Sequence, residues 1–273
     1  MNNNVDERVV QGFGDEWQRF DQSALSDAEL QTMFDAYFRI FPWAALPKNA
    51  EGFDAGCGTG RWAARVAPRV GRLHCIDASE GALSVARRNL AAFSNCTFHH
   101  SSVSAMPLAD ASMDFGYSLG VLHHVPDTEA AIAACVAKLK PGAPFLLYLY
   151  YRFDNRPAWY RALWKTTELL RFAISRSPRI LRHAAADILA ATVYFPLART
   201  ARLLKSESFP LAFYRNRSFY VMRNDALDRF GTRLEQRFTR DEIAAMMTRS
   251  GLRDITFSDA APFWCAVGWS GGL

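Results

Sequence analysis

The chain has 273 residues, of which 50% are hydrophobic, 13% aromatic and 22% charged. This composition is typical of a globular protein of one or two domains and excludes bulk disorder, a collagen-like repeat and low-complexity architecture. The five cysteines are scattered without a C-x-x-C pair. That pattern disfavours a zinc site or a disulfide framework and favours a reducing compartment, so we expect a cytoplasmic protein.

Neither the start of the chain nor its most apolar runs predict insertion into a membrane. Met1 is followed by three Asn residues rather than by an apolar segment, so no signal peptide is expected. The most apolar uncharged runs have 11 or 12 residues, as from Ile188 to Ala198. Runs of this length are too short to span a bilayer, so the sequence predicts no transmembrane segment.

Residues 1–50 are predicted to form an N-terminal helical segment, with a cap at Ser26. Short strands and helices then alternate, which predicts an α/β fold of the Rossmann-like, doubly wound kind, with helices on both faces of a parallel sheet. Helix starts are expected at Ser79 and Asp127, and a capping box at Thr239 and Glu242. The expected strands cover residues 53–55, 72–76, 97–100, 115–122, 145–150, 254–257 and 263–269.

A basic segment interrupts this alternation. Residues 152–217 contain 13 Lys and Arg against four Asp and Glu, whereas the rest of the chain contains 19 against 23. We therefore expect a helical insertion after the fifth strand, at 152–230, within a core formed by 51–151 and 231–273. Its basic and aromatic residues indicate either a cationic surface for an anionic partner, such as phospholipid, nucleic acid or a diphosphate, or a solvated face over a local core.

The most informative stretch is a glycine loop after the first strand. Glycines at 56, 58 and 60 allow a tight turn from strand to helix and a close approach to a ligand. Asp77 follows at the end of the second strand, where an acid can accept hydrogen bonds from ribose hydroxyls. Gly58-x-Gly60-x-x-Ala63 also satisfies the loose dinucleotide fingerprint, so this pattern alone allows a nicotinamide oxidoreductase.

Several ordered segments decide between these readings, because together they resemble the class I S-adenosylmethionine-dependent methyltransferases. The segments are Asp54-x-Gly56-Cys57-Gly58-Thr59-Gly60, Asp77, Met106-Pro107-Leu108 with Ser112–Phe115, Leu119–Asp127 and Leu139-Lys140-Pro141-Gly142. The resemblance covers about residues 50–151 and 231–269, and it does not extend to 152–230. It implies a seven-stranded sheet with an antiparallel last strand.

The resemblance also implies how the cofactor is held. The glycine loop would bind its methionine part and Asp77 its ribose, while Ser102 replaces the usual acid that accepts from the adenine amino group. The residues that we expect to bind S-adenosylmethionine are Trp17, Asp54, Gly56, Cys57, Gly58, Thr59, Gly60, Asp77, Ala78, Ser102, Val103 and Leu119. Trp17 belongs to an N-terminal stretch that is similar to openings in some members that modify sugars or secondary metabolites. It would act as a lid, or simply pack its helix on the sheet.

The catalytic candidates are His123 and His124, at the expected mouth of the active site. A histidine there would serve as general base for a hydroxyl acceptor, or would be structural. No cluster with metal-ligand spacing is visible, so we expect no metal. Cys57 is disfavoured as a nucleophile because no Pro-Cys motif of the cytosine-C5 type is present.

The sequence therefore predicts an S-adenosylmethionine-dependent methyltransferase whose acceptor is a small molecule or a glycan-type hydroxyl, with an anionic carrier as one option. The insertion would cap the acceptor site or contact a peripheral membrane surface. The alternatives are a methyltransferase for nucleic acid or protein, and a non-catalytic cofactor-binding regulator. Nucleic acid is disfavoured because the Asn/Asp/Ser-Pro-Pro-aromatic motif is absent. The sequence does not predict the oligomeric state.

Overall fold

The computed structural model describes residues 4–205 and 209–271. The Met1–Asn3 start, on which the expectation of no signal peptide rests, lies outside the described residues. The chain divides into two compact units. The first unit contains residues up to Asp21, Leu30–Asp154 and the residues from Leu234 onward, and the second contains Gln22–Glu29 and Asn155–Arg233.

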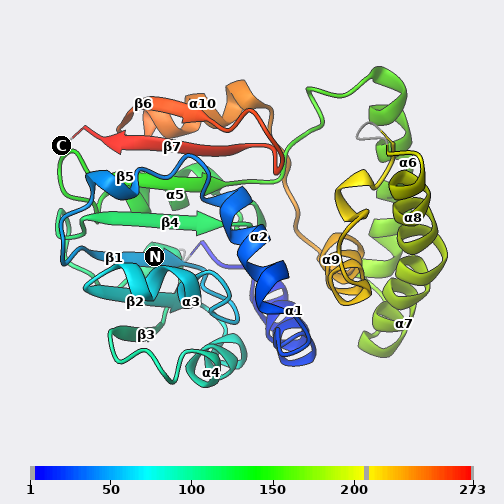
Figure 1. The fold of residues 1–273 in the computed structure, drawn as a ribbon, viewed down its shortest axis with the longest axis horizontal. Helices are drawn as coiled ribbons and strands as arrows, with labels where there is room; N and C mark the ends of the chain where they lie inside the picture. Colours follow the sequence, from blue (N-terminus) through cyan, green and yellow to red (C-terminus); the bar gives the residue numbers. More distant parts are fainter. Residues whose placement is uncertain (1–3, 206–208, 272–273) are drawn as a thin grey trace. The chain divides into compact units, whose positions relative to one another are not determined.

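The first unit is built on a seven-stranded sheet with the order β3-β2-β1-β4-β5-β7-β6. Neighbouring strands from β3 to β5 pair in parallel, whereas β7 is antiparallel to both β5 and β6 (Figure 1). This confirms the predicted Rossmann-like sheet with an antiparallel last strand. The strands are β1 (Glu51–Ala55), β2 (Arg72–Asp77), β3 (Cys96–His100), β4 (Phe115–Leu119), β5 (Pro144–Tyr148), β6 (Leu252–Phe257) and β7 (Cys265–Ser270).

The helices that accompany this sheet begin where the capping residues predict. Ser79 accepts a hydrogen bond from the backbone N–H of Ala82, Asp127 accepts one from Ala130, and Thr239 with Glu242 forms a complete capping box. The helices are α1 (Glu7–Arg19), α2 (Asp27–Tyr37), α3 (Ala63–Val66), α4 (Glu80–Asn89), α5 (Thr128–Val136) and α10 (Arg240–Arg249).

The fourth strand is shorter than the predicted range of 115–122. It ends at Leu119 because Gly120 takes a φ of +78°, a backbone conformation outside the β region. A 3-10 helix, Leu122–His124, follows it. The two candidate histidines therefore lie on a short helical turn beyond the end of the strand.

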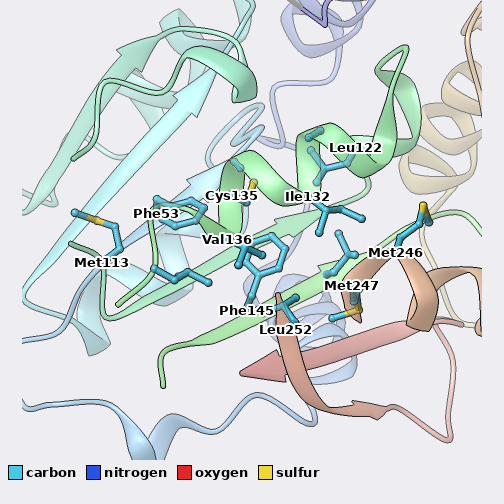
Figure 2. Close-up of a cluster of buried hydrophobic side chains, with 14 of the residues drawn as sticks. Phe53, Met113, Leu122, Ile132, Cys135, Val136, Phe145, Met246, Met247 and Leu252 are labelled. Atoms are coloured by element: carbon cyan, nitrogen blue, oxygen red, sulfur yellow. The ribbon is translucent and has the colours of Figure 1, made fainter. Parts of the chain in front are cut away.

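One face of the sheet is covered by α5 and α10. Figure 2 shows Ile132, Cys135 and Val136 of α5 with Met246 and Met247 of α10 in the same apolar cluster as sheet residues. Phe53 of β1 and Phe145 of β5 are the aromatic members of this cluster, and both are fully buried. Burying each of these side chains contributes about 1.5–3 kcal/mol, so this face anchors the strands whose ends carry the glycine loop.

Glycines let aromatic rings interlock between β1 and β4. Gly52 pairs with Phe115, and Phe53 pairs with Gly116, in the parallel register of the two strands. A Cβ added at Gly116 would lie 2.3 Å from Cζ of the Phe53 ring, and one added at Gly52 would lie 2.3 Å from the Phe115 ring. Each ring thus occupies the space that a side chain on the neighbouring strand would need.

The second unit is helical. Helix α9 packs against α6, α7 and the π-helical turn η5. The Arg223 guanidinium of α9 makes two hydrogen bonds, of 2.9 and 3.2 Å, to the Asp187 carboxylate of α7. The elements are α6 (Ala158–Ser175), α7 (Arg179–Leu189), η5 (Ala190–Tyr194), α8 (Phe195–Leu203) and α9 (Phe219–Gly231).

The expectation that no segment is long enough to cross a membrane needs correction. Elements α7, η5 and α8 form one continuous helix, Arg179–Leu203, of 25 residues with a mean hydropathy of 1.2 in its most apolar window. By length and composition alone this helix could cross a membrane, because helical structure continues through charged positions on either side of the uncharged run. A single helix of this kind is weak evidence for a membrane span.

The glycine–phenylalanine interlock can be tested with Gly116→Ala. We expect it to lower the free energy of unfolding by about 1–3 kcal/mol, because the buried Phe53 ring has no room to move. The matched control is Gly12→Ala in α1, where nothing lies within 4 Å of the added Cβ. The free energy of unfolding of Gly12→Ala should rise by about 0.5–1 kcal/mol. Urea denaturation of both variants measures the two effects, and a neutral Gly116→Ala would contradict the packing argument.

Candidate functional site

The glycine loop after β1 is held by the neighbouring strand. The backbone N–H groups of Gly56 and Cys57 both donate to the carbonyl of Ile76, at 2.8 and 2.9 Å. Gly56, Gly58 and Gly60 have φ values of +84°, +54° and +76°, which side-chain-bearing residues rarely adopt. The predicted turn of alternate glycines therefore forms at the carboxyl end of β1, where ligands bind in open α/β sheets.

Asp77 joins this loop to the next helix. Its Oδ2 accepts a hydrogen bond from the Gly58 N–H at 2.9 Å, and its Oδ1 accepts one from the Ser79 N–H at 2.8 Å. Burial raises the pKa of the Asp77 carboxyl, while these two hydrogen bonds act in the opposite direction. Each carboxylate oxygen has a second lone pair, so the clamp leaves acceptor capacity for a ligand.

Trp17 of α1 lies against the same loop. A Cβ added at Gly58 would lie 3.3 Å from Nε1 of its indole. Helix α1 approaches α4 closely because both helices have glycines at the contact. A Cβ added at Gly14 would lie 2.6 Å from the Ser79 hydroxyl, and one added at Gly81 would lie 3.5 Å from the Gly14 backbone. The structure thus brings Trp17 to the glycine loop, and its role as a lid stays a prediction.

The remaining predicted cofactor contacts line the same edge of the sheet. Ser102 precedes a short 3-10 helix, Val103–Ala105, after β3, and its hydroxyl is buried without a hydrogen-bond partner. Ala78 follows Asp77, and Leu119 ends β4. Thr59 is buried within the loop, and its carbonyl accepts a hydrogen bond from the Asn89 side chain at 3.0 Å.

Asp54 lies deeper, in β1 beside Tyr117 of β4. The strands pair these two residues, and both side chains are buried. Burial raises the pKa of the Asp54 carboxyl to about 8, an effect that the Tyr117 hydroxyl opposes and the Asp77 charge reinforces. Asp54 is therefore protonated and neutral at pH 7 in this structure, which differs from the charged acid that a binding motif suggests.

Cys57 has the properties of an inert thiol. A hydrogen bond with the Cys75 thiol favours its thiolate, but burial and the charges of Asp77 and Asp54 outweigh it and raise the pKa of Cys57 to about 11. Because the thiolate is the reactive form, this environment disfavours the thiol as a nucleophile.

The two candidate histidines differ in their environments. His123 is fully buried, and its ring stacks on Tyr150 with centroids 3.9 Å apart. Burial, with contributions from His124 and Arg237, holds its pKa well below the usual 6.5, so this imidazole is neutral. His124 places Nδ1 at 2.7 Å from the carbonyl of Leu234. A carbonyl only accepts, so Nδ1 carries the proton and Nε2 of the neutral ring carries the lone pair.

Sequence reasoning missed the aromatic and charged residues around these histidines. Tyr148 and Tyr150 lie at and just beyond the end of β5, and the Tyr37 ring meets Tyr148 edge-on at 5.0 Å between centroids. Arg237 lies 5.1 Å from the centroid of the Tyr150 ring and pairs with Glu235 at 2.7 Å. The tyrosines at 148 and 150, two residues apart in the predicted strand 145–150, were the available signal.

No three His, Cys, Asp or Glu side chains gather closely enough to hold a metal ion in the part of the chain that the structure describes.

Comparisons with known proteins show which proteins this chain resembles. Residues 53–142 match the methyltransferase domain family. The chain is 35% identical over 123 residues to the malonyl-[acyl-carrier protein] O-methyltransferase of Serratia marcescens, covering 44% of this chain and 46% of that protein. It is 36% identical over 115 residues to the ubiquinone biosynthesis O-methyltransferase of Hahella chejuensis, covering 41% and 46%. The chain thus spans about half the length of these curated relatives.

Solved structures share the fold over a larger part of the chain. The structure of an S-adenosylmethionine-dependent methyltransferase from Methanosarcina mazei has a TM-score of 0.52 at 17% identity, covering 85% of this chain and 98% of the other. One from Thermotoga maritima, described as a possible histamine N-methyltransferase, has a TM-score of 0.50 at 15% identity and covers 97% of both chains. The fold is that of a Rossmann-like methyltransferase. The core of the chain is therefore similar in sequence and in fold to class I S-adenosylmethionine-dependent methyltransferases.

The buried Asp54 predicts a specific dependence of stability on pH. The folded state keeps this proton up to about pH 8, whereas the unfolded chain loses it near the ordinary value of 3.8. The folded state therefore binds the extra proton between these pH values, and stability falls as pH rises, by up to about 1.4 kcal/mol per pH unit. Asp54→Asn removes this contribution.

The free energy of unfolding of Asp54→Asn, minus that of the parent protein, should therefore increase as the pH rises from about 5 to about 8. Urea denaturation at several pH values measures this difference, in which the contributions of other titrating groups cancel. A difference that does not change with pH would show that Asp54 is charged in the folded protein.

Proposed function

We propose that this chain transfers the methyl group of S-adenosylmethionine to an oxygen atom of a small-molecule acceptor. The observation that carries the proposal is the pairing of Asp77 with the Gly58 and Ser79 N–H groups at the carboxyl edge of the sheet. It places a carboxylate for ribose hydroxyls beside a loop that is open to close approach by a ligand. The matching of 53–142 to the methyltransferase domain family supports the same cofactor.

The residues of the site fit this cofactor. The buried Ser102 hydroxyl has no hydrogen-bond partner, and an orphaned buried hydroxyl is costly unless a ligand completes it. It is positioned in the chain to accept from the adenine amino group, with the Val103 N–H next to it. The missing Cβ at Gly58 lets the Trp17 indole lie close to the buried loop, where it provides an apolar surface.

The chain's own contribution to the reaction is chiefly positioning. When bound, S-adenosylmethionine supplies a methyl group activated by a sulfonium. In-line displacement needs the acceptor atom held on the far side of that methyl group, so orientation provides much of the acceleration. The tyrosines at 37, 148 and 150 form an aromatic wall near the end of β5 that helps to exclude water.

His124 is the residue that we assign as general base. The Leu234 carbonyl holds the proton on Nδ1, so the lone pair of the neutral ring lies on Nε2, the atom that we propose takes a proton from an acceptor hydroxyl. Both histidines are buried, and His123 is the weaker candidate because its ring stacks on Tyr150 and its pKa is held well below the usual value. We assign it a packing role.

The acceptor is proposed to be a small molecule with a hydroxyl group. The relatives named for malonyl-[acyl-carrier protein] and for ubiquinone biosynthesis are both O-methyltransferases, and a basic histidine nitrogen suits oxygen acceptors. A cap formed by residues 152–230 over such an acceptor stays a prediction.

The assay for this function has two parts. Isothermal titration calorimetry should detect binding of S-adenosylmethionine but not of NAD. Incubation with hydroxylated quinone precursors and acyl-carrier substrates should release S-adenosylhomocysteine. Binding of NAD in place of S-adenosylmethionine would contradict the cofactor assignment, whereas cofactor binding without turnover on any acceptor would favour a regulatory protein.

Replacing Asp77 by Asn should weaken the binding of S-adenosylmethionine by about 10- to 100-fold, because a charged hydrogen bond is worth about 1.5–3 kcal/mol. In this variant, either the Gly58 or the Ser79 N–H group would also face the NH₂ group of the new side-chain amide, which cannot accept its hydrogen bond. The control is Asp110→Asn, an exposed acid that pairs with Lys138 on the surface. Calorimetry should show unchanged affinity for the control, and equal affinities for both variants would remove Asp77 from the site.

Replacing His124 by Asn separates its two ring nitrogens. The Asn amide can still donate to the Leu234 carbonyl from the Nδ1 position, but it has no base at the position of Nε2. We expect kcat for a hydroxyl acceptor to fall by about 10²- to 10⁴-fold. Affinity for S-adenosylmethionine, measured by calorimetry, should stay within about threefold of the parent value. An unchanged kcat would leave His124 with a structural role only.

A further inference from the structure

The exposed apolar side chains of this protein are concentrated in one unit. In the described residues, every large apolar side chain recorded as exposed lies between Trp159 and Phe219, within the second unit. The set comprises Trp159, Leu163, Leu169, Leu170, Phe172, Ile180, Leu181, Ile188, Val193, Phe195, Leu203, Leu204, Phe213 and Phe219. Exposed apolar surface on this scale marks an interaction site rather than ordinary solvent-facing surface.

The long helix Arg179–Leu203 is apolar on the side that faces away from its own unit. The residues that it buries are mostly alanines, at 186, 190, 198 and 201. Leu181, Ile188 and Phe195 follow one another at seven-residue intervals and are 60%, 61% and 41% exposed. A helix whose only partner was its own unit would bury the large side chains and expose the alanines, because burial energy scales with apolar area.

The polar groups of this helix are used inside the second unit, which argues against a membrane-spanning role. Asp187 binds the guanidinium of Arg223 in α9. Arg199 donates to the carbonyls of Arg215 and Arg217, at 2.9 and 3.3 Å. Crossing a bilayer would place these groups in hydrocarbon, whereas a helix lying in the plane of the interface buries only its apolar side.

The charge around this apolar surface is positive. Glu168 pairs with Arg171 and Arg229, and Asp187 pairs with Arg223, so these two acids are neutralised within the unit. Basic side chains remain exposed on the same elements, at Arg161, Lys165, Arg176, Arg202 and Lys205. Arg202 stands seven residues after Phe195, at the end of the exposed apolar series, where its alkyl stem can extend the apolar side and its charge can reach a headgroup.

We propose that the second unit docks on an anionic phospholipid bilayer, with the helix Arg179–Leu203 lying in the interface plane through Leu181, Ile188 and Phe195. The charge selects this occupant. A second copy of the chain would bring a basic surface against a basic surface, whereas anionic headgroups complement the exposed arginines and lysines. The proposal concerns binding alone and does not depend on methyl transfer.

The test uses the full chain and sedimentation with vesicles at about 0.1 M salt. Vesicles of phosphatidylcholine with about 30% phosphatidylglycerol should bind the protein at least about tenfold more tightly than phosphatidylcholine alone. The variant Ile188→Gln with Phe195→Gln should lose at least about tenfold of this binding, because it removes the apolar contact. Ile188 is exposed, whereas the Phe195 ring also contacts Phe219 and Arg199, so the thermal unfolding midpoint should fall only slightly, and circular dichroism checks that the variant stays folded.

Charge reversal tests the contribution of the basic side chains to binding. Arg202→Glu with Lys205→Glu should weaken binding to the anionic vesicles by at least about tenfold. Arg88→Glu, an exposed residue of α4 in the first unit, is the matched control and should bind like the parent protein.

Three outcomes would overturn the proposal. They are no binding of the parent protein to anionic vesicles, equal binding by the Ile188→Gln and Phe195→Gln variant, and a dimer that this variant dissociates without any lipid binding. The last would show that the surface joins two copies of the chain, and light scattering detects it.

Discussion

The carboxylate of Asp77 joins three parts of the candidate site that are separate in the sequence. Through the N–H groups of Gly58 and Ser79 it connects the glycine loop, the end of β2 and the start of α4. Its glycines would give the loop wide backbone freedom, so its geometry depends on this carboxylate and on the Ile76 carbonyl, which accepts from Gly56 and Cys57. The Asp77 carboxylate orders the loop and keeps lone pairs for a ribose. Cofactor binding and loop geometry therefore depend on the same side chain.

Beneath this clamp, β1 and β4 are joined by an interlock that depends on the absence of side chains. Phe53 and Phe115 each fill the space left by a glycine on the neighbouring strand. The same two strands carry Asp54 and Tyr117, whose burial keeps the Asp54 carboxyl protonated at neutral pH. The carboxyl beneath the site is therefore neutral, and Asp77 is the acid that contacts the glycine loop.

The two units place their large apolar residues in opposite ways. The first unit buries Phe53, Phe145 and several leucines between the sheet and helices α5 and α10 (Figure 2). The second packs its long helix through alanines and exposes leucine, isoleucine and phenylalanine.

The sequence by itself determined the elements of the core and the order of the motifs, because caps at Ser79, Asp127 and Thr239 and the glycine loop act over a few residues. Only the tertiary structure decided the tautomer of His124, the raised pKa of Asp54 and the contact of Trp17 with the loop. The His124 tautomer and the Trp17 contact depend on partners far away in the chain, Leu234 and Gly58, and the pKa of Asp54 is raised by its burial in the folded sheet. The tertiary structure also decided which side of the helix Arg179–Leu203 is exposed. Periodicity shows only that a helix has two sides, and packing against α9 decides which of them is buried.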